Sequence, residues 1–398
     1  MNAMFFAFSR YSGIVLAWLM LFSVQAQKTD RIRVGLFWEN RPQALLCTVH
    51  QGSYALYADG KKLRDFSGSD VVRLTVSDGR VHVKTFQGAL GTFQRVVFRE
   101  TQAQAALNLK ASKPAQANRT YEDDLVVSVY RGKLKVVNEA SFSNYLAGVV
   151  QSEAGNGHEP EYYKVQAIIS RTYALKHFRR FQAEHGFNLC DRVDSQVYKT
   201  WGYNDTIRQA VETTKDVVIV DADIQLITAV FHSNSGGQTV NSEDVWTTPR
   251  PYLRATEDTF SVCQPHYEWI STYSRQDYLG YFARRHGVDT GQVDARQQLL
   301  NYCPDARTGA FLTVNEQNIP LKYVRKDLGL NSTLFCVSQS QDSVVIAGCG
   351  FGHAVGLSQE GAMRMAEEGY TYTDILHHYY RDIHLIKLSV IDFFREDP

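Results

Sequence analysis

The segment Tyr145-Leu-Ala-Gly-Val-Val-Gln-Ser-Glu153-Ala154 places one carboxylate at the end of an apolar run. The small residues Gly155-Asn-Gly157 follow it, and a second amphipathic run covers residues 159–181. This pattern predicts two helices that meet near Glu153. A lone Glu at a helix end is usually solvated, so Glu153 becomes a candidate for chemistry only if other motifs support it.

Local signals support both helices. Ser141 or Ser143 can cap the first, because a hydroxyl at this point accepts a hydrogen bond from a free backbone amide. Pro160 suits the first turn of the second, where its missing amide has no cost. The second helix carries an apolar stripe that indicates packing on a core, formed by Val165, Ile168, Ile169, Thr172, Leu175 and Phe178.

The composition describes an ordered protein with a sizeable core, since the 398 residues are 44% hydrophobic and 12% aromatic. Basic and acidic residues balance at 42 each, so the net charge does not favour nucleic acid or anionic lipid as a partner. The 22 Tyr and 21 Phe include enough aromatic faces for a sugar-binding cleft, although most will form the core.

The first 26 residues are typical of an export signal. Arg10 supplies the positive region, residues 14–22 the apolar region, and Ser23-Val-Gln-Ala26 a cleavage site before Gln27. An uncleaved anchor is the alternative, but the apolar run is shorter than the ~20 residues that span a bilayer. We therefore expect an exported protein, periplasmic or at the cell surface, without a membrane span after cleavage.

The six cysteines are even in number, and an exported chain permits disulfides. Their connectivity does not follow from the sequence. One hypothesis pairs Cys336 with Cys349 around a probable hairpin and Cys263 with Cys303 across a helical insertion.

The chain divides into a β-rich start and a mixed remainder, which predicts an α+β fold. Residues 31–107 contain short alternating runs separated by Asp59-Gly60, Ser67-Gly68 and Asp78-Gly79, which are hairpin turn signals. Residues 108–120 are polar and contain Pro114, which predicts a linker that ends a β-rich module of residues 27–120. Residues 121–398 predict a β pair, further helices including 204–214, strands at 216–220 and 224–231, and an inserted subdomain at about 260–345.

Two glycine-containing segments can bring backbone amides close to a ligand. The first is His232-Ser-Asn-Ser-Gly-Gly-Gln-Thr239, and the second is Gly350-Phe-Gly-His-Ala-Val-Gly-Leu-Ser-Gln-Glu-Gly-Ala362, which enters a helix. An ordinary polar loop and a buried structural His353 are the alternative interpretations. The first segment is not a phosphate loop, because no Gly-Lys-Ser/Thr follows it.

In their order along the chain, these segments resemble the stage II sporulation protein D (SpoIID) and amidase-enhancer LytB family. The similarity includes the Glu153 segment, residues 164–175, residues 191–198, the His232 segment with Val245-Trp246, and the Gly350 segment. Members of the SpoIID type are lytic transglycosylases, which cleave the MurNAc–GlcNAc bond of peptidoglycan strands free of stem peptides and leave a 1,6-anhydro-MurNAc end. The resemblance implies that Glu153 is the catalytic carboxylate.

The resemblance also implies that the other matched segments line the substrate cleft. The candidate substrate-binding residues are Lys164, Gln166, Arg171, Tyr173, Gln196, Tyr198, His232, Ser233, Asn234, Ser235, Gly236, Gly237, His353, Ser358 and Gln359. One carboxylate suffices for this reaction, because the sugar's own 6-hydroxyl attacks the anomeric carbon once the leaving oxygen is protonated. Glu153 acts first as acid and then as base, so we expect a partly desolvated position and a raised pKa.

Two residues depart from the family pattern: Ala354 replaces a Gly, and Glu360 replaces a Trp. Some relatives bind zinc through Cys and His in the loop that corresponds to residues 185–198. Here His185 and Cys190 have no second Cys nearby, so we expect no cofactor, with zinc at His185 and Cys190 as the alternative.

The expected partner is the glycan strand of peptidoglycan. A second hypothesis is a non-catalytic protein that binds glycan and stimulates a cell-wall amidase, the activity for which the LytB branch is named. A third is a surface protein whose β-rich module binds another ligand. A role in sporulation does not follow from the sequence.

Overall fold

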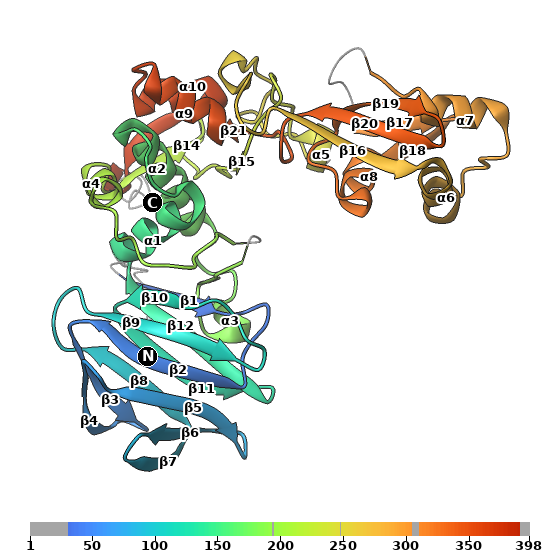
Figure 1. Cartoon of the computed structure of the whole chain (residues 1–398). Coiled ribbons are helices and arrows are strands. Elements are labelled where there is room, and N and C mark those ends of the chain that lie inside the picture. Colours follow the sequence, from blue (N-terminus) through green and yellow to red (C-terminus); the bar gives the residue numbers. More distant parts are fainter. Residues whose placement is uncertain (1–30, 193–194, 247, 305–309, 391–398) are drawn as a thin grey trace, which may run out of the picture.

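A computed structural model describes residues 31–192, 195–246, 248–304 and 310–390 (Figure 1). Helices and strands both occur in quantity, which confirms the α+β class. The expected export signal lies outside the described residues. Among those residues, no helix combines the length and the apolar character needed to cross a membrane.

The first part of the chain forms two antiparallel β-sheets that share one hydrophobic core (Figure 1). A seven-stranded sheet has the order β13-β1-β12-β11-β8-β3-β4, and a six-stranded sheet has the order β10-β9-β2-β5-β6-β7. Within these two sheets as described, only β13 joins its neighbour in parallel. The strands are β1 (Arg31–Leu36), β2 (Ala44–Gln51), β3 (Ser53–Ala58), β4 (Lys61–Ser67), β5 (Val71–Ser77), β6 (Arg80–Thr85), β7 (Gly88–Phe93), β8 (Arg95–Glu100), β9 (Ala106–Ser112), β10 (Arg119–Glu122), β11 (Asp124–Tyr130), β12 (Lys133–Ser141) and β13 (Leu189–Cys190).

Turn chemistry explains two of the predicted hairpins. Asp59-Gly60 joins β3 to β4, and Asp78-Gly79 joins β5 to β6, with positive φ at all four residues. Such angles match the twist of paired strands. Ser67-Gly68 instead leads from β4 in one sheet to β5 in the other, so the hairpin predicted there is wrong.

The linker predicted at residues 108–120 is also wrong. Residues 108–112 belong to β9 and residues 119–120 to β10, and these strands pair with Leu109 opposite Arg119, so the residues between them connect a hairpin. Leu107, Leu109 and Ala111 are buried on alternate positions, a period-2 pattern that the polar residues between them conceal. The β-rich part also extends past residue 120 to Ser141, because β11 and β12 pair with β8 and β1.

A mainly helical region follows, arranged around α2 (Figure 1). Ser141 caps α1 by accepting a hydrogen bond from the Asn144 amide at 3.2 Å, and Pro160 begins α2, as predicted. The predicted strand at 224–231 is wrong except for its last residue, because Leu226 forms only an isolated bridge with Val220 and the strand is limited to Phe231–His232. The elements are α1 (Phe142–Ala154), α2 (Pro160–Lys176), α3 (Gln182–His185), α4 (Asp205–Thr213), β14 (Val217–Val220), β15 (Phe231–His232), α5 (Glu243–Trp246), η1 (Thr259–Ser261), β21 (Leu357–Ser358), α9 (Gln359–Glu367), α10 (Tyr372–Tyr379) and β22 (His384–Lys387).

The region between η1 and β21 has a hydrophobic core of its own and projects to one side in Figure 1. This core includes Trp269, Phe282, Leu299 and Ile346. The elements are β16 (Glu268–Ser274), α6 (Arg275–His286), α7 (Val293–Leu300), β17 (Phe311–Val314), β18 (Gln317–Pro320), α8 (Leu321–Leu328), β19 (Leu334–Ser340) and β20 (Ser343–Cys349).

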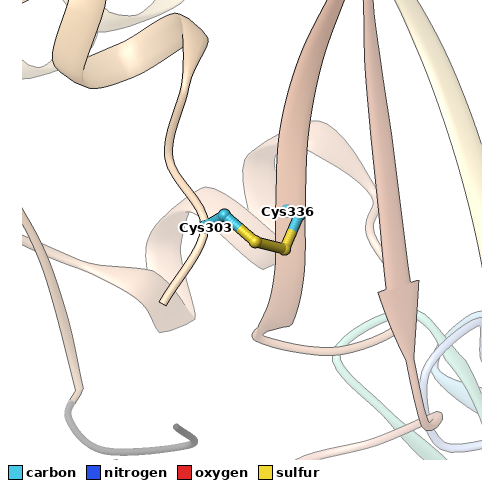
Figure 2. Close-up of a disulfide and its surroundings, with 2 residues drawn as sticks. All are labelled: Cys303 and Cys336. Atoms are coloured by element: carbon cyan, nitrogen blue, oxygen red, sulfur yellow. A yellow bond between two sulfur atoms is a disulfide. The ribbon is translucent and has the colours of Figure 1, made fainter. Parts of the chain in front are cut away.

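A disulfide joins Cys303 to Cys336 in this region (Figure 2). The hypothesis for the disulfides is therefore wrong in both pairs. Cys336 lies opposite Ala347 across the β19–β20 hairpin, so Cys349 is out of register with it.

Candidate active site around Glu153

Glu153 lies in the last turn of α1 and is half-buried. Its Oε1 accepts a hydrogen bond from the Val197 backbone amide at 2.9 Å. Burial raises the pKa of the carboxyl, while the Val197 hydrogen bond and the charge of Lys199 oppose the rise. The direction of this pKa shift is the one expected from the sequence, and it favours a carboxyl group that can release and recover a proton.

Two buried tyrosines adjoin Glu153. Burial raises the pKa of Tyr145 and of Tyr162, and the charge of Glu153 adds to both shifts. The Tyr145 hydroxyl donates to Gln196 Oε1 at 2.9 Å, and Gln166 Nε2 donates to the Tyr162 hydroxyl at 3.1 Å. Both glutamines were candidates from the sequence, whereas neither tyrosine was. Tyr162 precedes Gln166 by one helical turn, which is the signal that would have revealed it.

Tyr162 also connects the Glu153 segment to the Gly350 segment. The Gln359 side-chain amide lies near enough to the Tyr162 hydroxyl to lower its pKa against the larger effect of burial. The contact is part of the packing of α9 against α2. Glu153 and Gln359 therefore approach the same phenol from opposite halves of the chain.

Each of the three glutamines retains a buried polar atom without a hydrogen-bond partner among the described residues. These atoms are Gln166 Oε1, Gln196 Nε2 and Gln359 Nε2. An unmet buried amide group costs roughly 1–3 kcal/mol, so such groups usually meet water or a ligand. Their donors and acceptors match the hydroxyl and acetamido groups of a sugar.

The two glycine-containing segments meet in a short parallel pair, in which His232 of β15 lies opposite Ser358 of β21. His232 Nδ1 lies 3.2 Å from the Val355 carbonyl oxygen. The ring of His353 lies 5.4 Å from that of His232 and 5.0 Å from that of Trp246. Three rings thus form a row from β15 to α5.

Several candidates hold the fold together instead of facing a ligand. Asn234 Nδ2 donates to the Ser261 carbonyl and to Glu360 Oε2, so both amide hydrogens are used internally. The Ser235 hydroxyl is buried against Asp258 and Ser261. The Ser358 hydroxyl caps α9.

Arg171 and Tyr198 also have structural roles. Arg171 is buried and donates to the carbonyl oxygens of Val217 and Val211, which ties α2 to β14 and α4. Tyr198 is buried, and its hydroxyl donates to Asn138 on β12 at 2.8 Å. Both side chains are therefore engaged within the fold.

The remaining candidates lie nearer to the surface. Lys164 forms an ion pair with Glu161 at 2.5 Å, and the Tyr173 hydroxyl accepts from Arg180 at 3.3 Å. Ser233 is half-buried, and its carbonyl accepts from the amide of Glu360.

Glycine at positions 236 and 237 has a conformational reason, since φ is +73° and +93°. A Cβ on Gly236 would lie 2.8 Å from the Cys349 backbone, so this loop passes directly against the end of β20.

The two departures from the family pattern have clear positions. Glu360 is buried, and it accepts from Asn234 at 2.7 Å and lies 2.5 Å from His266 Nδ1. Its carboxylate therefore joins loops of the protein. Ala354 is buried with a φ of +60°, a left-handed conformation that favours the Gly of the family pattern.

The loop that reaches Glu153 is fixed to the β-rich region by Asp191. Its carboxylate accepts from the amides of Phe37 and Trp38 and forms an ion pair with Arg119. Nearby, the ring of His185 packs on Trp38, and Cys190 Sγ lies 3.4 Å from the Ser195 hydroxyl. Within the described part of the chain, no three His, Cys, Asp or Glu side chains gather as a metal site would need.

Comparisons with known proteins agree on one family. The SpoIID family model, described as "Stage II sporulation protein", matches residues 130–220, which include Glu153. Stage II sporulation protein D of Bacillus subtilis (strain 168) is 30% identical over 297 residues, 71% of this chain and 84% of that protein. The same protein of Bacillus amyloliquefaciens is 30% identical over 316 residues, 76% of this chain and 89% of that protein. The amidase enhancer of Bacillus subtilis (strain 168) is 27% identical over 287 residues, 59% of this chain and 39% of that protein.

Proposed function

The chain belongs to the SpoIID family, and from this premise we propose that it is an exported lytic transglycosylase of peptidoglycan. It cleaves the MurNAc–GlcNAc bond of glycan strands free of stem peptides and leaves 1,6-anhydro-MurNAc ends. The observation that carries the proposal is the half-buried Glu153, with its raised pKa, together with three glutamines that contact the tyrosines near it and each retain an unmet polar atom.

Glu153 supplies both proton transfers. In the protonated form favoured by its raised pKa, it gives its proton to the glycosidic oxygen as the bond to the anomeric carbon breaks. The 6-hydroxyl of the same MurNAc attacks that carbon and returns its proton to the Glu153 carboxylate, which restores the enzyme. Water is not consumed. The attack is intramolecular and so has a high effective concentration.

The reaction needs no second free carboxylate, and two acids that contact or belong to the glycine-containing segments are already engaged within the fold. Glu360 is engaged by Asn234 and His266, while Asp258 accepts from Ser235 and from Tyr379. A hydrolase would need one of them to activate water or to act as nucleophile. Polar side chains around Glu153 therefore serve to hold the sugar.

The test replaces Glu153 with Gln in the full chain and measures soluble products from amidase-treated peptidoglycan. The loss of general acid–base catalysis should lower the rate by about 10²–10⁴-fold while binding to glycan is retained. The exposed Glu159, which makes no capping bond, gives the matched control Glu159→Gln with wild-type activity. If Glu153→Gln retained the activity of the wild type, Glu153 could not be the general acid and base.

The similarity to an amidase enhancer supports a second candidate function, a glycan-binding protein that stimulates a cell-wall amidase. One experiment distinguishes the two candidate functions. If the wild-type chain releases no sugar products alone but accelerates an amidase, and Glu153→Gln does so equally well, the second function is correct.

A further inference from the structure

A pocket of about 320 Å³ lies between the helical region and the projecting region that has its own core. Residues of the loop around α5 form one wall, and residues of β17, α8 and β19 form the other. Most of the lining is aromatic or aliphatic, including Val240, Val245, Tyr302, Phe311, Leu321 and Tyr323. Sequence motifs gave no indication of it, because its two walls come from separate hydrophobic cores.

Two aromatic rings of this pocket are unusually accessible. Phe311 is 50% exposed and Tyr323 is 44% exposed. Aromatic rings of this size normally bury most of their surface, and those left accessible at a concave site commonly mark a binding surface. Flat, accessible rings suit the apolar face of a pyranose, which can lie against them while its hydroxyls stay in water.

Of the charged residues that line the pocket, Glu243, Asp244 and Arg325 are engaged elsewhere in the protein, and Lys322 places its Nζ over the Tyr323 ring, 5.4 Å from the ring centre. Arg254 donates to both oxygens of Glu243 at 2.6 Å. Asp244 accepts from the amide of Asn241, and Arg325 Nε donates to the Asn331 carbonyl at 3.0 Å. A neutral ligand therefore fits this lining better than a peptide that carries several carboxylates.

The pocket borders the two glycine-containing segments through His353. This side chain lines the pocket, and its ring lies 5.4 Å from that of His232 on β15. A glycan strand repeats similar rings along its length, so a strand held beside Glu153 has further sugars available to reach such a pocket.

We propose that this pocket is a distal subsite that binds one neutral N-acetylated sugar of the strand whose MurNAc lies at Glu153. The identity of the ligand rests on the proposed function. A volume of about 320 Å³ is at the lower end of small-molecule sites and suits a single pyranose unit. The consequence is a preference for long strands, since short ones cannot reach both sites.

The experiment measures the affinity of Glu153→Gln full-length chain for denuded glycan strands of graded length by isothermal titration calorimetry. Tyr323→Ala and Phe311→Ala are each added to this background. Both rings are half exposed, so their removal disturbs folding little. Each should weaken binding of long strands about 10-fold and leave the affinity for the shortest strands unchanged. Phe86→Ala removes an 86% exposed ring that does not line the pocket and should change neither affinity.

Unchanged affinity for long strands in both pocket variants, or an equal loss for short and long strands, would overturn the subsite. Product analysis of the wild-type chain separates this result from the function. If anhydro ends form without any length effect from the pocket variants, the subsite is wrong and the proposed function stands. If the length effect is present but no anhydro end forms, the subsite stands and the transglycosylase is wrong.

Discussion

Replacing Arg119 by Met should loosen the loop that positions Glu153. Arg119 lies 2.5 Å from the Asp191 carboxylate, and the two side chains are only 13% and 3% exposed. Asp191 also accepts from the backbone amides of Phe37 at 2.7 Å and Trp38 at 3.1 Å. The ion pair therefore joins β10 to the loop whose Val197 amide reaches Glu153.

Breaking a buried ion pair by removing one partner costs roughly 3–5 kcal/mol, because the other charge stays buried without compensation. Asp191 would keep its two amide donors, so we expect the lower end, about 3 kcal/mol of unfolding free energy. In the wild type, the hydrogen bond from the Val197 amide lowers the pKa of Glu153. A displaced loop weakens this hydrogen bond. The pKa of Glu153 should therefore rise further in Arg119→Met, and the protonated acid should persist to higher pH.

Urea unfolding of the wild type, Arg119→Met, Asp191→Asn and the double variant measures the coupling between the two residues. The double variant should lose clearly less than the sum of the single losses, because it buries no unpaired charge. Arg99→Met is the matched control, since Arg99 pairs with Asp124 at 3.8 Å but is 61% exposed, and it should cost at most about 1 kcal/mol. Additive losses within about 0.5 kcal/mol, or a loss below about 1 kcal/mol for Arg119→Met, would refute this role of the pair.

Three further changes have defined outcomes. Lys199→Met removes a charge that lowers the pKa of Glu153, so the pH above which activity falls should move upward. The control Lys84→Met on β6 should leave the pH dependence of activity unchanged, and a shift to lower pH in Lys199→Met would contradict this effect of the Lys199 charge. Glu153→Gln should stabilise the protein to unfolding at neutral pH, because the pKa of Glu153 is higher in the folded than in the unfolded protein, so wild-type stability falls as the pH rises through these pKa values. This gain in stability should vanish in acid, below the unfolded pKa, and a loss of stability at neutral pH would contradict the prediction. Cys303→Ser removes the disulfide to Cys336, which spans a separation of 33 residues, and should lower the stability of the projecting region by about 3–4 kcal/mol in denaturant unfolding. Cys47→Ala alters no disulfide and is the control, so equal losses in the two variants would contradict a stabilising role of the disulfide.

Local chemistry made much of the fold predictable. The hydroxyl of Ser141 and the ring of Pro160 fix where two helices begin, and each acts within its own turn. Asp59-Gly60 and Asp78-Gly79 adopt the positive φ that hairpins require. These features depend on a few neighbouring residues, so a single sequence contains them.

Pairings between distant segments could not be predicted in the same way. The partner of β1 is β12, and residues 108–112 form part of a strand because β9 lies beside β2. Likewise, Cys336 bonds to Cys303 because β19 passes the end of α7, a neighbourhood that no turn signal indicates.

For the candidate site, the matched segments predicted a region but did not separate side chains that the fold engages fully from those that retain an unmet polar atom. Three glutamines contact the two tyrosines near Glu153, namely Gln166, Gln196 and Gln359. The Asn234 side-chain amide instead donates to groups within the fold. Both kinds of side chain are polar and occur in the same motifs. Only the contacts distinguish them.

The measurement that tests the central proposal most directly is the mass of the sugar ends released from denuded glycan by the wild-type chain. Intramolecular attack through Glu153 predicts 1,6-anhydro ends, lighter by one water molecule than hydrolysed ends, and none from Glu153→Gln. Ordinary reducing ends would show that water is the nucleophile and that a second carboxylate takes part, which would contradict the mechanism.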